Sequence, residues 1–126
     1  MNYFLFLNKI IELGIEAATK DYNRPDQKSI REGSIMGFEA CRNKNILQLA
    51  QLLEESRQKS QDHILKRKNT KKFENEHWKL RGYELEVEWV CNVLSAALVN
   101  QGMPPIVQPT ARGLITAANI LGIKQQ

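Results

Sequence analysis

Cysteine and histidine are scarce in this sequence. Two of each occur among its 126 residues, and Cys41 and Cys91 are too far apart for the short ligand spacings of a zinc site. We therefore predict no metal and no cofactor. Two isolated cysteines are also more typical of reduced thiols than of a disulfide framework, so we expect a cytoplasmic protein.

Long apolar runs are absent as well. No stretch approaches the roughly 18–20 apolar residues that cross a bilayer, so we expect no membrane contact. The opening segment MNYFLFLNKII is apolar but has neither a basic leader nor a small-residue cleavage site, so we expect no signal peptide. Hydrophobic residues at 42% and charged residues at 25% are typical of a globular chain, and we predict one domain covering residues 1–126.

No segment alternates between apolar and polar residues as a strand would, whereas helical spacing recurs throughout the chain. The sequence predicts an all-α fold, a compact helical bundle of about five helices with one long helix and a short C-terminal helix. The expected helices cover residues 3–22, 25–42, 45–65, 73–100 and 110–121. Asn45 and Gln48 form a capping-box pattern, and Gly102 with Pro104 and Pro105 ends the long helix.

Three small residues follow one line of the second helix, at Gly33, Gly37 and Cys41. Small side chains four residues apart let another helix approach closely. We interpret this line as a packing surface.

The long helix has a lane of polar residues between two apolar stripes. The lane comprises His77, Arg81, Glu84, Glu88, Asn92 and Ser95, while Lys79 and Glu86 are expected to point outward. Two interpretations remain open. Either the lane is a buried ion-pair network, or it lines a ligand groove in which Trp78 and Trp89 stack on a nucleobase and Asn92 contacts its edge.

The segment PPIVQPTARG leads into the last helix. Its three prolines restrict the backbone, and its arginine places a cation near the helix start. Thr110 can cap the helix, Arg112 adds a positive charge, and Gly113 leaves room for an atom near the backbone. These residues predict a phosphate or carboxylate at the helix start. The alternative is that Arg112 meets a carboxylate of the protein, such as Glu84 or Glu88.

Net charge is +4, and one run of five cations contains no acid: Lys66, Arg67, Lys68, Lys71 and Lys72. This run can contact nucleic acid or another anion, or it can be a solvated loop. Glu84 and Glu88 place two carboxylates on one helix, which is similar to the all-α nucleotide pyrophosphohydrolases. The Glu-x-x-Glu and Glu-x-x-Asp helices that hold magnesium in those enzymes are missing, however.

The stretch EWVCNVLSAALVNQGMPPIVQPTARG, residues 88–113, resembles a segment of small uncharacterised phage and prophage proteins. The resemblance implies a phage setting, in the host cytoplasm, where small proteins include anti-defence sponges for cyclic nucleotide signals. We therefore predict a non-enzymatic, homo-oligomeric protein that binds a small phosphorylated, nucleotide-like ligand. Its predicted contacts are Trp78, Arg81, Glu88, Trp89, Asn92, Thr110, Arg112 and Gly113. The alternatives are an inhibitor of a host protein or nucleic acid, and a nucleotide pyrophosphohydrolase.

Overall fold

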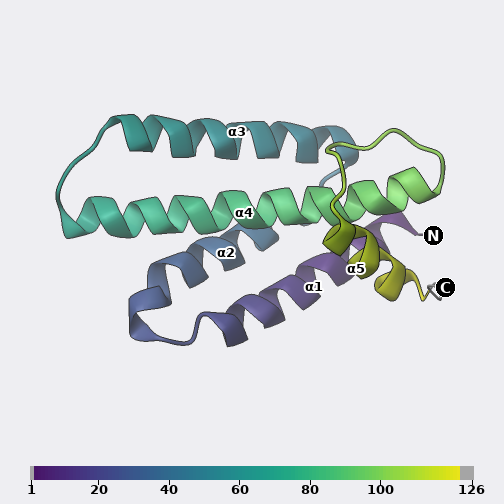
Figure 1. The fold of residues 1–126 in the computed structure, drawn as a ribbon, viewed down its shortest axis with the longest axis horizontal. Helices are drawn as coiled ribbons and strands as arrows, with labels where there is room; N and C mark the ends of the chain where they lie inside the picture. The colour runs from purple at the N-terminus through teal and green to yellow at the C-terminus, as the bar shows by residue number, and fades with distance from the viewer. Residues whose placement is uncertain (1, 123–126) are drawn as a thin grey trace.

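Helices account for the regular structure of residues 2–122, the part of the chain that the computed structural model describes (Figure 1). The elements are α1 (Tyr3–Asp21), a 3₁₀ turn η1 (Pro25–Gln27), α2 (Lys28–Ala40), α3 (Ile46–Leu65), α4 (Lys71–Asn100) and α5 (Ala111–Leu121). The predicted all-α bundle, with one long helix and a short C-terminal helix, is confirmed.

Side chains at the helix starts explain most of these boundaries. The capping box is present, since Asn45 Oδ1 accepts from the Gln48 backbone N–H (2.8 Å) and Gln48 Oε1 accepts from the Asn45 backbone N–H (2.9 Å). Thr70 caps α4 in the same way through Phe73 (3.1 Å), which is why the long helix begins two residues earlier than predicted. Gly102, with φ of 74°, follows the end of α4 in the left-handed conformation expected after a helix.

The second helix is shorter than predicted. It ends at Ala40 instead of Arg42, and the chain then turns through Asn43, whose φ is 57°. Asparagine is one of the few residues that adopt this left-handed conformation readily.

Two antiparallel helix pairs form the bundle, α1 with α2 and α3 with α4, and α5 crosses one end of it (Figure 1). The long helix α4 contacts every other helix. Its residues between 87 and 98 supply much of the core, which includes Val87, Val90, Cys91, Leu94 and Leu98.

Glycines join α2 to α4. A Cβ on Gly33 would collide with the backbone carbonyl of Lys79, and a Cβ on Gly37 would lie 2.6 Å from the Tyr83 carbonyl oxygen. From the other side, a Cβ on Gly82 would lie 2.5 Å from a carbonyl oxygen of α2. The predicted packing line is thus confirmed at both glycines of α2. Because Gly33 faces Lys79 and Gly37 faces Tyr83, α2 and α4 run parallel, and both helices start at the same end of the molecule.

Candidate functional site

Asn92, Thr110 and Gly113 form one hydrogen-bonded cluster where α5 begins against α4. The Asn92 amide group donates to Thr110 Oγ1 (3.0 Å), and Asn92 Oδ1 accepts from the Thr110 backbone N–H (3.0 Å). Thr110 Oγ1 also accepts from the Gly113 backbone N–H (3.1 Å) and so caps α5, as predicted. A Cβ on Gly113 would collide with Asn92 Oδ1, so the atom that approaches this glycine belongs to the protein itself. Asn92 is 9% exposed, and both polar atoms of its side chain form hydrogen bonds with Thr110.

Ser95 fastens the proline-rich linker, residues 101–110, to the same face of α4. Its Oγ accepts from the backbone N–H groups of Ile106 (3.0 Å) and Val107 (3.1 Å), and the side chain is fully buried. The C-terminal half of the polar lane therefore holds the linker in place.

The N-terminal half of the lane forms two ion pairs, in which Glu84 is largely buried and the other three side chains are about half exposed. Arg81 lies 3.5 Å from Glu84, and Glu88 lies 3.9 Å from Arg57 of α3 instead of pairing with Arg81. Solvent screens exposed pairs of this length, so each contributes little to stability.

Trp89 and Arg112 meet, as the sequence predicts for one site. The guanidinium carbon of Arg112 lies 5.8 Å from the centroid of the Trp89 ring, which is within cation–π range. Arg112 forms no ion pair with Glu84 or Glu88. Trp78 stands apart from this contact, since it lies eleven residues earlier on α4, about 16 Å along the helix, and is 44% exposed.

A groove of about 490 Å³ lies beside the Trp89–Arg112 pair, between α1, α4 and α5. Glu86 and Asp21 also line it. The prediction that Glu86 points outward is wrong, because α1 and α5 flank this face of α4. Burial, with a smaller contribution from Asp21, raises the pKa of Glu86 to about 7. Two carboxyl groups beside one guanidinium make this groove unfavourable for a phosphate.

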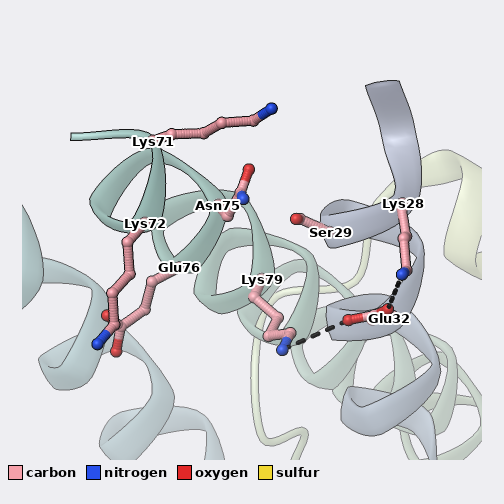
Figure 2. Close-up of a pocket in the computed structure, with 8 residues that line it drawn as sticks. All are labelled: Lys28, Ser29, Glu32, Lys71, Lys72, Asn75, Glu76 and Lys79. Atoms are coloured by element: carbon pink, nitrogen blue, oxygen red, sulfur yellow. Dashed lines mark ion pairs between the residues drawn. The ribbon is translucent and has the colours of Figure 1, made fainter. Parts of the chain in front are cut away.

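A second cleft, of about 690 Å³, lies at the shared end where α2 and α4 begin (Figure 2). Its lining residues are Lys28, Ser29 and Glu32 of α2 and Lys71, Lys72, Asn75, Glu76 and Lys79 of α4. We call it the lysine cleft. It contains four lysines and no aromatic residue.

The lysine cleft has unpaired cations. Glu32 lies between two lysines, 3.9 Å from Lys28 Nζ and 3.4 Å from Lys79 Nζ. Lys71 and Lys72 have no ion-pair partner in the described part of the chain. In Figure 2, Lys71 extends over the cleft toward α2, while Lys72 lies beside Glu76.

Another hollow adjoins the lysine cleft, and Lys71 lines both. It has a volume of about 910 Å³ and is lined by Arg67, Lys68, Asn69, Thr70, Lys71, Phe73, Glu74 and His77. The lysine cleft and this hollow together present six cations and three carboxylates. The basic run seen in the sequence is therefore continuous with Lys28 and Lys79, which come from elsewhere in the chain.

Metal and thiol chemistry find little support in residues 2–122. No three side chains among His, Cys, Asp and Glu are grouped to hold a metal ion there. Burial is the main reason that the pKa of Cys41 and the pKa of Cys91 are both raised to about 12, so neither thiol is an available nucleophile. Within the same residues, each helix is too short or too polar to serve as a membrane-spanning segment.

Sequence reasoning missed Lys28, Lys79, Glu86 and Asp21. The lysines belong to two different helices, and only the parallel packing of α2 on α4 brings them together. The one available signal was Lys28, which lies in the opening turn of α2, where the helix dipole favours acids.

Comparisons with known proteins give no relative to guide the assignment: no family model, curated protein or solved structure matches this chain.

Proposed function

We propose that this protein is a non-enzymatic binding protein for a phosphate-rich ligand, and that the phosphates bind at the lysine cleft. The observation that carries the proposal is that four lysines from two parallel helices line one concave surface, with Lys71 extending over it toward α2 (Figure 2). This keeps only the phosphate of the small nucleotide-like ligand predicted from the sequence. It also moves the phosphate contacts away from the start of α5, where Asn92 already binds the capping residue Thr110.

The positions of the lysines support an anionic ligand. Lys28 is the first residue of α2, and Lys71 and Lys72 are the first two residues of α4. The N-terminus of a helix carries partial positive charge, so each cation there destabilises its helix by a few tenths of a kcal/mol or more. The first turn of α2 contains no acid that would offset this charge. The first turn of α4 does contain an acid, Glu74. A bound phosphate would therefore compensate the start of α2 and the lysines of both helices.

The shape of the surface favours a strand of linked phosphates over a single nucleotide. The lysine cleft has no aromatic side chain on which a base could stack, and its Ser29 hydroxyl and Asn75 amide suit phosphate and sugar contacts. The cations continue through Arg67 and Lys68 into the adjoining hollow. We therefore propose the backbone of a nucleic acid, bound without sequence preference, as the ligand.

Fluorescence anisotropy with a labelled single strand and a labelled duplex, each about 20 nucleotides long, tests this function across roughly 50–200 mM salt. If the four cleft lysines each neutralise one phosphate, log K should fall with log salt at a slope of about −3 to −4. Replacing Lys71 and Lys72 with glutamine should weaken binding and make that slope shallower by about 1.5.

The matched control replaces Lys9 and Lys59, two exposed lysines outside both hollows, with glutamine. It changes the net charge by the same amount and should leave the slope unchanged. Equal losses in the two double variants would show diffuse attraction and no site. If the wild type binds a cyclic dinucleotide and neither nucleic acid, the nucleotide-sequestering function replaces this one.

A further inference from the structure

The groove between α1, α4 and α5 exists because α1 presents small residues to it. Gly14, Ala17 and Ala18 lie on the α1 wall, and Gly14 has no side chain because the Phe38 ring of α2 occupies that space. Larger apolar residues complete the walls: Ile10, Leu13, Leu85 and Ile120. The result is a groove of about 490 Å³ with both apolar and polar walls, a size suited to a small molecule.

Glu86 is the exceptional group in these apolar surroundings. It lies one turn before Trp89 on the same face of α4, and within residues 2–122 its carboxyl group has neither a hydrogen bond nor an ion pair. Arg112, a cation that also lines the groove, lies over the Trp89 ring. A half-buried carboxylate normally has a partner, because removing it from water without one is costly. In the described part of the chain, no side chain fills this role for Glu86.

The other charged groups of the groove are Asp21, which adds negative charge, and Arg112, which adds positive charge over Trp89. Asp21 and Tyr22, at the end of α1, also line it, and Tyr22 lies close enough to Glu86 for that carboxyl group to raise the pKa of the tyrosine, after burial as the main cause. Arg31 of α2 is turned away to the Tyr22 backbone carbonyl oxygen (3.2 Å). Trp89 adds an aromatic side chain to the groove wall, with Arg112 5.8 Å from its ring centroid.

We propose that this groove is a binding site for an organic cation, a protonated primary amine on an apolar stem. Glu86 pairs with the ammonium group, Asp21 adds attraction, and the stem lies against the apolar walls and Trp89. The site is separate from the lysine cleft, since the two share no lining residue.

The test is a titration of ¹⁵N-labelled protein followed by NMR, with hexylamine as the probe and hexanol and hexanoate as probes of equal chain length. Hexylamine should shift the amide signals of groove residues and bind at least tenfold more tightly than hexanol, and hexanoate should not bind. Equal affinities for hexylamine and hexanol would overturn the proposal, because an apolar hole alone would explain them.

Glu86→Gln separates a ligand-binding role from a structural one. If Glu86 awaits a ligand, the variant should melt at the same or a higher temperature than the wild type and should lose at least tenfold in hexylamine affinity, with hexanol affinity unchanged. A lower melting temperature with unchanged hexylamine affinity would show a structural role and sink the proposal. Asp21→Asn, at an exposed position, should reduce hexylamine affinity by about two- to fivefold.

A lysine side chain presents the same chemistry as a free amine. Nα-acetyl-lysine methylamide therefore serves as a further probe. Tighter binding of this derivative than of hexylamine would assign the groove to a lysine of a partner, and weaker binding would assign it to a free amine. Failure of both cationic probes, while nucleic acid still binds, would reject this site and leave the proposed function standing.

Discussion

Gly33→Ala is the most direct test of how α2 packs on α4. The added methyl group would collide with the Lys79 carbonyl oxygen and would lie 2.7 Å from its carbonyl carbon and 2.8 Å from its Cα. All three obstacles are backbone atoms of a neighbouring helix. None can rotate aside as the end of a flexible side chain would.

The size of the effect follows from two opposing contributions. Forcing an extra methyl group into a packed interior costs about 1–3 kcal/mol, and a backbone obstacle places this site at the upper end. Alanine recovers up to about 1 kcal/mol relative to glycine inside a helix. We expect the free energy of unfolding to fall by about 2 kcal/mol, which corresponds to a drop in Tm of roughly 6–10 °C for a chain of this size.

Thermal and urea unfolding, followed by circular dichroism, measure this loss. Gly102→Ala is the matched control, because its Cβ would meet nothing within 4 Å and only its φ of 74° opposes the change. The control should cost about 1 kcal/mol. A Gly33→Ala protein that melts at or above the wild-type temperature would refute the close parallel packing of α2 and α4, and with it the convergence of the cleft lysines.

Three further predictions follow from buried groups. The pKa of Glu86 is raised from 4.5 to about 7 in the folded protein. The free energy of unfolding should therefore fall by about 1–2 kcal/mol as the pH rises from about 4.5 to 7, after allowance for solvent screening. Glu86→Gln should remove this decrease, and a variant with the wild-type pH profile would contradict the raised pKa of Glu86. Ser95→Ala should lower the free energy of unfolding by about 1–3 kcal/mol. It should also speed hydrogen exchange at residues 106 and 107, whose N–H groups lose their acceptor. Slow exchange at these residues in the variant would count against the contact between Ser95 and the linker. Cys41 and Cys91 should resist iodoacetamide at about pH 8 until the protein is unfolded, and fast alkylation of the native protein would disprove their burial.

The helices could be predicted from the sequence because their signals are local. The Asn45–Gln48 capping box, the Thr110 cap and the glycine at 102 each act within a few residues, so their patterns carry over directly into the structure. Gly33 and Gly37 indicated a close helix contact for a similar reason, since a missing side chain is a property of the residue itself. The sequence did not show which helix fills that space.

The candidate sites depended on partners that are distant in the chain. Asn92 has the right chemistry for a nucleobase, but α5 folds back and Thr110 takes its hydrogen bonds. Glu86 lies on a face that helical periodicity alone assigned to solvent, and the position of α1 turns that face into a groove wall.

The sequence by itself determined the all-α fold, the caps at Asn45 and Thr110 and the basic run, because helix propensity, capping and charge act over a few neighbouring residues. Tertiary structure decided which of these charges share a surface. Lys28 and Lys71 are 43 positions apart in the sequence, and they line one cleft only because glycine contacts hold α2 parallel to α4, so that two helices begin at the same end of the bundle.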